Sequence, residues 1–588
     1  MDVKRVQNQS HETLSTDFRS ATISPVTKLS LNLWGAGWLE GPQFSLLSGK
    51  YMSDTTADAI PAGRPDMRGG EHPAFRMFFL GIVFVALGFV GYSVLSDLHA
   101  ADGQGVAIGA FVLLGLALLI ALGFEFVNGF HDTANAVATV IYTNSLPPLV
   151  AVVWSGMWNL LGVLVSSGAV AYSIVSLLPV ELILQVGSGS GHAMIFALLL
   201  AAIIWNLATW AMGIPNSSSH ALIGSIMGVG IANQLMAPHG IATQGVDWVQ
   251  VTKVFKSLLF SPICGFVLSA ALLILMKVVI RNRKLYEAPK GDQPPPWWIR
   301  GLLIGTCTGV SFFHGGNDGQ KGMGLIMLIL IGAAPTAYAL NRAMPDSMTP
   351  GFVQSADYAA EAFRAHVAPG SSTPDIEEAR HIVSDALSSR NVAGSQVWSA
   401  LAVLSDSVSN AVKSYGSLRG MPSASVSNVR TDMYLTSDAI RTMKGGDTFT
   451  TDENGRLKKF MQALNDGTRF IPIWVKIAVA VALGLGTMVG WKRIVITVGE
   501  KIGKTHLTYA QGAAAEIVAM GTIGLAEGYG MPVSTTHILS GGVAGTMAAN
   551  GSGLQWSTLR TMALAWVITL PAAMMISGVL YILLRQVF

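Results

Sequence analysis

The sequence contains few charged residues and almost no cysteine. Asp, Glu, Lys and Arg make up 12% of the 588 residues and the formal net charge is only +3, so we expect no nucleic-acid partner. Cys264 and Cys307 both lie in apolar segments, which argues against a disulfide framework or a cysteine metal site. Residues 1–74 lack the basic start, apolar stretch and small-residue cleavage site of a signal peptide. They are predicted to form a polar N-terminal tail.

Apolar residues dominate what is present, because 51% of the chain is hydrophobic and glycine occurs 64 times. About 20 apolar residues suffice to cross a bilayer as a helix. We therefore expect an all-α polytopic membrane protein with ten to twelve spans. The stretches that approach or exceed this length are 75–95, 105–127, 149–178, 193–212, 254–280, 297–313, 323–340, 470–491, 509–526 and 559–584.

Two unusual motifs each occur twice. Residues 213–220 read GIPNSSSH and residues 530–537 read GMPVSTTH, while residues 128–135 read NGFHDTAN and residues 314–321 read HGGNDGQK. Glycines follow the proline of each hydroxyl-rich motif at the same offsets, namely Gly224 and Gly228 in the first copy and Gly541 and Gly545 in the second. Duplicated acids and hydroxyl-rich turns within apolar sequence are typical of a transporter built from internal repeats.

The motifs divide the chain into two transport repeats, residues 105–280 and 301–588. A basic linker, 281–300, joins them, an extra transmembrane span at 75–95 precedes them, and a polar stretch at 341–469 reads as an extramembrane insert within the second repeat.

Loop charge predicts that the two repeats are inverted, since short cytoplasmic loops accumulate Lys and Arg. The entry to the first repeat, 96–104, has no Lys or Arg, whereas the linker 281–300 carries several and is predicted to be cytoplasmic. Likewise 166–191 has no basic residue, while its counterpart 491–504 has four. The side of the membrane that holds the insert stays open, because long loops do not obey the charge rule.

Each hydroxyl-rich motif is predicted to be the tip of a re-entrant helical hairpin. Pro215 and Pro532 would end one helical pass and begin the next, and the hydroxyl groups would cap the new helix. The free amides of a helix N-terminus bind anions. Two tips that meet at the bilayer midplane would enclose a small oxyanion, with His220 and His537 orienting the hairpins.

Acidic residues within apolar segments are the other candidates for function, because an ionisable group in a membrane is costly. Asp132 and Asp318 are the main ones. Two aspartates would repel phosphate, so protons or cations must share the cavity, with the amides of Asn128, Asn135 and Asn317 as partners. Glu125 and Glu516 would relay protons or merely line a polar cavity.

These motifs, together with GWKRIV at 490–495 and VGEKIG at 498–503, resemble the inorganic phosphate transporter (PiT) family, and closely its bacterial low-affinity permeases. The resemblance covers about residues 105–588. It implies secondary active uptake of phosphate across the bacterial inner membrane, with no catalytic residue, cofactor or resident metal. It places around phosphate and the coupling ions Asp132, Asn135, Ser217, Ser218, Ser219, Asp318, Ser534, Thr535 and Thr536.

One residue departs from the pattern of the sodium-coupled members of the family. Lys321 occupies the position at which the resemblance implies Asn in those members. The first repeat has Asn135 at the corresponding position. An ammonium there could replace a bound sodium ion or contact phosphate, which favours proton coupling. A second interpretation is that Lys321 only pairs with Asp318.

Several alternatives remain at this stage. Phosphate could travel as a neutral divalent-metal complex, the coupling ion could be sodium, and the substrate could be sulfate or another oxyanion. A remote alternative, suggested by the adjacent His131 and Asp132, is a membrane-embedded metal phosphohydrolase. A homodimer is compatible with the sequence.

Overall fold

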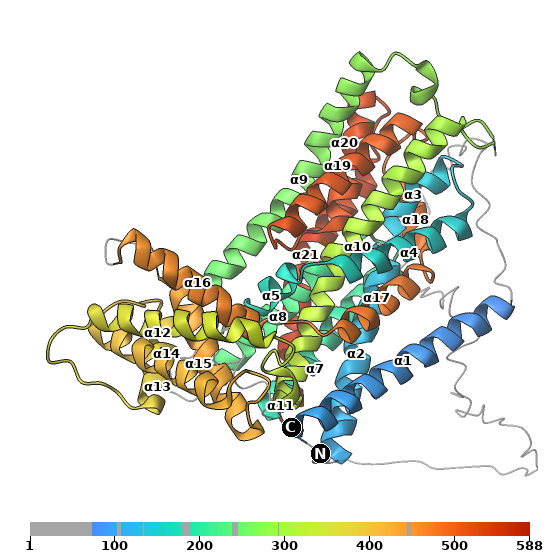
Figure 1. Ribbon diagram of the computed structural model, residues 1–588. Coiled ribbons are helices and arrows are strands. Elements are labelled where there is room, and N and C mark those ends of the chain that lie inside the picture. Colours follow the sequence, from blue (N-terminus) through green and yellow to red (C-terminus); the bar gives the residue numbers. More distant parts are fainter. Residues whose placement is uncertain are drawn as a thin grey trace, which may run out of the picture. The chain divides into compact units, whose positions relative to one another are not determined.

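The computed structural model describes residues 73–102, 108–132, 134–178, 189–237, 245–291, 293–443 and 449–588, and every regular element among them is helical (Figure 1). No β-strand is found within these ranges, so the prediction of an all-α protein is confirmed. The predicted N-terminal tail lies outside the described residues, apart from its last two positions.

Two sets of helices follow each other along the chain. The first set is α2 (Ile108–Asp132), α3 (Ala134–Tyr142), α4 (Pro148–Val165), α5 (Ala169–Val175), α7 (Gly189–Ala211), α8 (Ser218–Leu235) and α9 (Trp248–Val279). The second set is α10 (Trp297–Ala333), α17 (Ile473–Thr487), α18 (Lys492–Glu500), α19 (Tyr509–Gly528), α20 (Thr535–Asn550) and α21 (Trp556–Leu584). Helix α1 (Pro73–Asp102) precedes both, and the short helix η2 (Arg283–Tyr286) lies between them.

Six helical segments in the described residues are long and apolar enough to cross a membrane, or seven if α17 is counted with the helix before it. The expectation of ten to twelve spans is therefore too high by this measure. The reason is that α8, α10 and α19 carry buried polar or charged side chains, and α20 has only 16 residues. Such helices cannot be recognised by apolar length alone.

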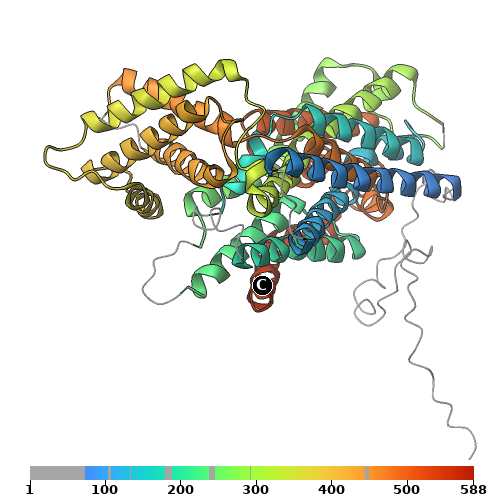
Figure 2. The same ribbon diagram turned by 60° about the horizontal axis from the view of Figure 1, so that its bottom comes forward.

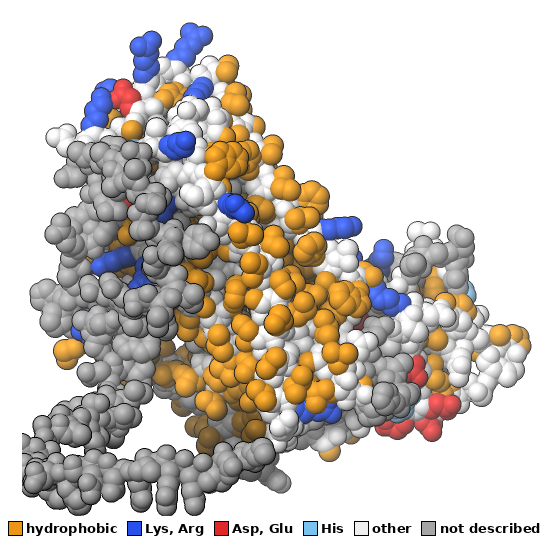
Figure 3. Space-filling view, turned by 180° about the vertical axis from the view of Figure 1, so that it is seen from behind, with side chains coloured by type: hydrophobic (Ala, Val, Ile, Leu, Met, Phe, Trp, Pro, Cys, Tyr) orange, Lys and Arg blue, Asp and Glu red, His pale blue; other side chains and the backbone are white. Residues whose placement is uncertain are grey.

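The outer face of the helices is apolar, as expected where lipid is the solvent. Figure 3 shows hydrophobic side chains spread over a broad area of one side of the molecule. Along α9, for example, Phe260, Leu275 and Val279 expose 57%, 57% and 68% of their surface. Together with the long apolar helices, this surface indicates a multi-pass membrane protein.

Helix α10 is a single continuous helix of 37 residues. The apolar stretch 297–313 and the first part of 323–340, up to Ala333, therefore belong to one element, which contains the HGGNDGQK motif in its middle. At 1.5 Å per residue its length is about 55 Å, more than enough to cross a bilayer once. The short helix α11 (Pro335–Tyr338) follows it.

The insert folds as a helical bundle with a core of its own (Figure 2). Phe352, Phe363 and Phe460 are fully or almost fully buried within it. Thr450 and Glu453 form a capping box at the start of its last helix, which fixes the helix end. Its elements are η3 (Asp346–Met348), α12 (Thr349–Ala365), α13 (Ile376–Ser388), α14 (Ser395–Tyr415), α15 (Ser423–Thr442) and α16 (Thr451–Thr468).

Helices of the two sets pack against each other in pairs: α8 along α21, α20 along α9, α4 along α10 and α17 along α2. Glycine allows the backbones to approach closely, as is common between membrane helices. A Cβ on Gly228 of α8 would lie 2.1 Å from the Met574 carbonyl oxygen of α21, and a Cβ on Gly545 of α20 would lie 2.1 Å from that of Phe266 in α9.

Replacing Gly228 with alanine should separate α8 from α21 and destabilise the fold by about 1–3 kcal/mol, the usual cost of overpacking. Thermal unfolding of the purified protein in detergent measures this effect. The matched control is Gly521→Ala in α19, where no atom lies within 4 Å of the new Cβ, so stability should stay the same or rise. Equal unfolding temperatures for both variants would contradict the packing argument.

Candidate functional site

The two hydroxyl-rich motifs form nearly identical turns. Gly213 follows α7 with φ +66° and Gly530 follows α19 with φ +65°, a left-handed conformation that glycine adopts without strain. The chain then passes Pro215 or Pro532 and starts a new helix. Ser217 and Ser534 are the N-caps of α8 and α20, and their hydroxyls accept hydrogen bonds from the backbone N–H groups of His220 and His537, at 3.3 and 3.2 Å.

Both turns contact Asp132, the last residue of α2. The Ser218 hydroxyl, from the first turn, donates to Asp132 Oδ2, and the Thr536 hydroxyl, from the second, donates to Asp132 Oδ1 at 2.7 Å. Ser218 Oγ also lies 2.7 Å from Asn128 Oδ1. His131 Nδ1 lies 3.2 Å from Asp132 Oδ1. The Asp132 carboxylate thus contacts one turn that lies 86 residues later in the sequence and another that lies 404 residues later.

Lys321 links the second acid to both turns. Its ammonium donates to Asp318 Oδ1 at 2.6 Å and to the Ser219 hydroxyl of the first turn. It also lies 3.5 Å from the carbonyl oxygen of Val533 in the second turn. Lys321 and Asp318 are both fully buried, and a buried charge pair of this kind is held only where hydrogen bonds satisfy it.

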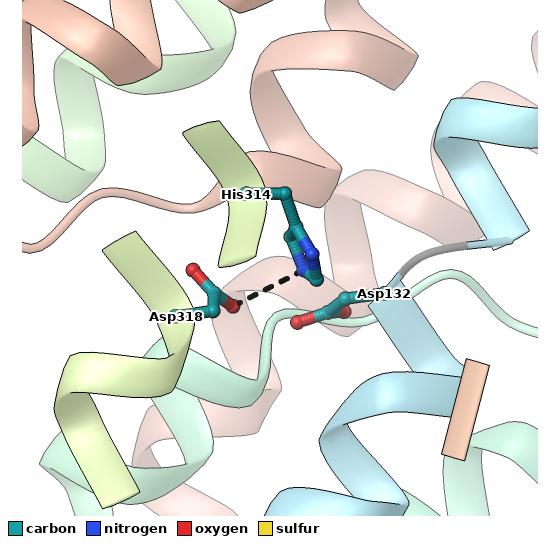
Figure 4. A group of neighbouring side chains, drawn as sticks. All are labelled: Asp132, His314 and Asp318. Carbon is teal, nitrogen blue, oxygen red and sulfur yellow. Dashed lines mark ion pairs between the residues drawn. The ribbon is translucent and has the colours of Figure 1, made fainter. Parts of the chain in front are cut away.

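His314 lies between the two acids (Figure 4). Its Nε2 is 3.6 Å from Asp318 Oδ2, and its Nδ1 is 2.7 Å from Asn159 Oδ1 on α4. Asp132, His314 and Asp318 each offer one ligand atom within 4.8 Å of the others, so this group could hold a cation or share a proton. No role was predicted for His314 from the sequence. Its position one helical turn before Asp318 is the signal that could have identified it.

Asn317 and Glu125 border the same region. Asn317 Nδ2 donates to the carbonyl oxygen of Met531 at 3.2 Å, while its Oδ1 is buried and has no hydrogen-bond partner among the described residues. Glu125 Oε2 lies 3.5 Å from Asn128 Nδ2, and Glu125 packs against Gly322, which leaves its Oε1 without a partner. The Thr535 hydroxyl is likewise buried and unpaired.

The remaining predicted residues lie in other surroundings. Glu516 accepts hydrogen bonds from Thr139 of α3 and Thr306 of α10, and no hydrogen bond joins it to Asp132 or Asp318. The rings of His220 and His537 lie 4.8 Å apart, and His537 also contacts Trp566, with ring centroids 4.3 Å apart. The backbone of Asn135 belongs to α3, but its side chain lies outside the described residues.

A family model and sequence relatives point to the same family. The family model described as the phosphate transporter family matches residues 128–577. The chain is 40% identical to the low-affinity inorganic phosphate transporter PitB of Escherichia coli (strain K12), over 81% of this chain and 98% of that protein. It is 41% identical to the transporter PitA of the same strain, over 83% and 99%. Among solved structures, one described as the sodium-dependent phosphate transporter is similar at 19% identity and a TM-score of 0.45, covering 81% of this chain and 100% of that one.

Proposed function

The chain belongs to the phosphate transporter family, and we propose that it imports inorganic phosphate across the bacterial inner membrane by proton symport. The family is one of transporters, which leaves no support for the phosphohydrolase alternative. The observation that carries the proposal is the convergence of both hydroxyl-rich turns on Asp132 and Lys321, at a site buried between α2 and α10.

The chemistry of this site suits phosphate. Hydroxyl groups of Ser218 and Thr536 and the Lys321 ammonium are hydrogen-bond donors, and the free amides at the starts of α8 and α20 add to them. Hydrogen phosphate also carries a proton and therefore needs an acceptor, which Asp132 and Asp318 provide. Sulfate is fully ionised and would meet only repulsion from these carboxylates. On this basis we assign the substrate contacts to Asp132, Asp318, Lys321 and the hydroxyl groups of residues 217–219 and 534–536, with Asn135 completing the set.

We further propose that the two sets of helices are inverted repeats whose tips are re-entrant hairpins. Matched close contacts support this arrangement. A Cβ on Gly129 of α2 would lie 2.3 Å from the Leu483 carbonyl oxygen of α17, and a Cβ on Gly315 of α10 would lie 2.1 Å from the Asn159 carbonyl oxygen of α4. These glycines occupy the same position, three residues before the aspartate of each acidic motif.

The direction of α2 and α10 also supports inversion. Asp132 lies near His314, whereas Glu125, two turns earlier in α2, packs against Gly322, two turns later in α10. The two helices that carry the acids therefore run antiparallel. Since α10 crosses once, the insert that follows it should lie on the side opposite to the basic linker 281–300. With the linker cytoplasmic, the insert faces the outside.

The charges that share the site support proton coupling. Lys321 neutralises the charge of Asp318. The negative charge of Asp132 then remains next to an incoming phosphate, which is also negative. A proton held by His314, which lies between the two acids, would offset that repulsion on loading and leave with the substrate. Transport of phosphate as a neutral complex with a divalent cation would serve the same purpose. We assign further contacts of the proton to Asn128, Asn317 and Glu125, which border the site. Glu516 of α19, bonded to Thr139 and Thr306, would relay the proton only from outside this set of contacts.

Uptake of radiolabelled phosphate into proteoliposomes tests this function. We expect uptake driven by an inward proton gradient, little response to a sodium gradient, and no inhibition by excess sulfate. Runs with and without magnesium distinguish free phosphate from a metal complex. Uptake driven only by sodium would overturn the coupling mechanism, inhibition by sulfate would overturn the substrate assignment, and no uptake under any gradient would overturn transport itself.

A further inference from the structure

Arginine side chains gather where α15 of the insert meets α5. The Arg430 guanidinium lies 5.7 Å from the ring centroid of Tyr434, on the same helix, and the Arg469 guanidinium lies 5.8 Å from that of Tyr172 on α5. Asp438, Arg441, Arg469 and Arg430 all act electrostatically on Tyr434. We refer to these three arginines and two tyrosines as the arginine cluster. Tyr434 also packs against the apolar core of the membrane helices, so the cluster lies at the base of the insert.

Arg430 is the unusual member of the cluster. It is only 9% exposed, its Nε is buried without a hydrogen-bond partner, and no carboxylate in the described part of the chain pairs with it. Burial lowers the pKa of its guanidinium, yet arginine remains protonated in proteins. A buried charge without a counter-ion is strongly unfavourable. Arg430 therefore requires a negatively charged partner that the described protein does not supply.

Two other arginines of the insert have carboxylate partners, unlike Arg430. Arg380 pairs with Asp432 through two nitrogens, at 2.6 and 3.2 Å. Arg441, within the cluster, pairs with Asp438. Arg380 and Arg441 are thus paired with carboxylates of the insert, whereas Arg430 has no such partner among the described residues, and Arg469 contributes a second positive charge nearby.

Tyrosine hydroxyls complete a set of donors. The Tyr172 hydroxyl is buried and has no hydrogen-bond partner in the described part of the chain, and the charges of Arg430 and Arg469 both act on it. Guanidinium forks match the geometry of phosphate oxygens, and a phenol can donate to a third oxygen. The open donors therefore fit a tetrahedral oxyanion better than a planar carboxylate with two acceptor atoms.

The cluster is connected to the transport site through α5. Ser173, next to Tyr172, donates to the carbonyl oxygen of Gly530 at 2.6 Å. Gly530 opens the second hydroxyl-rich turn, in which the Val533 carbonyl oxygen approaches Lys321. An anion bound at the cluster would lie beside the segment that closes the transport site.

We propose that the arginine cluster is a second phosphate-binding site, at which the insert holds a phosphate group beside the second turn. The group is either free phosphate on its way to Asp132 and Lys321 or the headgroup of an anionic lipid. The existence of this site is independent of transport, whereas its use for substrate capture rests on the proposed function.

Phosphate-dependent thermal unfolding of the purified full-length protein tests the site directly. The other substitutions are made in the Asp132→Asn variant, so that phosphate bound at the transport site contributes less to the change in unfolding temperature. Inorganic phosphate should raise the unfolding temperature of this variant, and addition of Arg430→Gln should abolish the rise, because ligand that binds only the folded state stabilises it. Arg456→Gln, an exposed arginine of the same bundle, is the matched control and should leave the rise intact.

The unfolding temperature of Arg430→Gln in phosphate-free buffer distinguishes a structural role of Arg430 from a binding role. If Arg430 binds an anion, Arg430→Gln removes an uncompensated charge and should not lower the unfolding temperature in phosphate-free buffer. A lower temperature there, or a phosphate response unchanged by Arg430→Gln, would overturn the proposal. Arg469→Gln gives an independent check and should weaken the response in the same way.

Uptake assays identify the source of the phosphate group. If the site captures free phosphate, Arg430→Gln should raise KM for uptake by about tenfold and leave kcat within about twofold, as expected for loss of one charge-assisted contact. If the ligand is a lipid, phosphatidylglycerol vesicles without free phosphate should stabilise the protein through Arg430, phosphatidylcholine vesicles should not, and KM should stay unchanged. If phosphate stabilised the protein in a way that Arg430→Gln abolished, while the wild-type protein showed no uptake, the proposed function would be rejected and the second binding site would be retained.

Discussion

Replacing Asp132 with asparagine should reduce phosphate uptake at least about 100-fold while the protein remains folded. Asp132 accepts one hydroxyl hydrogen bond on each carboxylate oxygen, from Ser218 and from Thr536. An amide keeps a single acceptor oxygen, so one of the two turns loses its contact. The variant also lacks the negative charge that we propose accepts the proton of phosphate. Losing a charge-assisted bond and a proton acceptor together accounts for an effect of this size.

The measurement is initial uptake in proteoliposomes, with the amount of folded protein checked by size-exclusion chromatography. Asp97→Asn on α1 is the matched control. Tyr338 and Trp474 both donate to the same oxygen of Asp97, at 2.8 and 2.9 Å, and an amide oxygen can accept both bonds. This control should transport normally. Uptake within about twofold of wild type for Asp132→Asn would remove Asp132 from the site.

The sequence predicted the acids and the hydroxyl-rich turns because their chemistry is unusual within apolar segments. An aspartate such as Asp318, followed by Lys321 one turn later, stands out against a membrane background. The sequence could not predict which hydroxyl meets which acid. Ser218 and Thr536 reach the same carboxylate only because α8 and α20 come together in three dimensions, and spacing along the chain carries no information on that approach.

Glycine explains why α10 was predicted as two apolar stretches. The glycine-rich segment between 313 and 323 lowers apolar content and suggests a break. In the structure these glycines are packing positions. A Cβ on Gly315 would meet the Asn159 backbone, and one on Gly319 would meet Val163 of α4 at 2.5 Å. Tertiary contact with α4 therefore compensates for the low helix propensity of glycine. This contact cannot be read from the sequence of α10 alone.

The insert shows a different limit of sequence reasoning. Its helices are amphipathic, and its polar composition identified it as lying outside the membrane spans. The pairing of Arg380 with Asp432, across 52 residues, and the unpaired state of Arg430 depend on how α13 and α15 pack. No local pattern distinguishes a paired arginine from an open one.

Replacing Lys321 with asparagine should change the coupling ion. The substitution gives the second acidic motif the residue that the first motif has at Asn135. Without the ammonium, Asp318 is left as a fully buried carboxylate that a cation must neutralise. The new amide oxygen, Asp318 and the carbonyl oxygen of Val533 are hard oxygen ligands suited to a cation such as sodium. We expect proton-driven uptake to fall at least about tenfold and sodium-driven uptake to rise above background.

Uptake under separate proton and sodium gradients measures this change, and Lys476→Asn provides the matched control. Lys476 is a half-buried lysine of α17 that donates to the carbonyl oxygen of Ser166 at 2.8 Å, with no acid of the site among its partners. Its replacement removes the same charge and should leave proton dependence intact. If Lys321→Asn remained proton-driven and gained no sodium response, the ammonium would serve only as the ion-pair partner of Asp318. Coupling would then rest on the group formed by Asp132, His314 and Asp318 without a contribution from the ammonium.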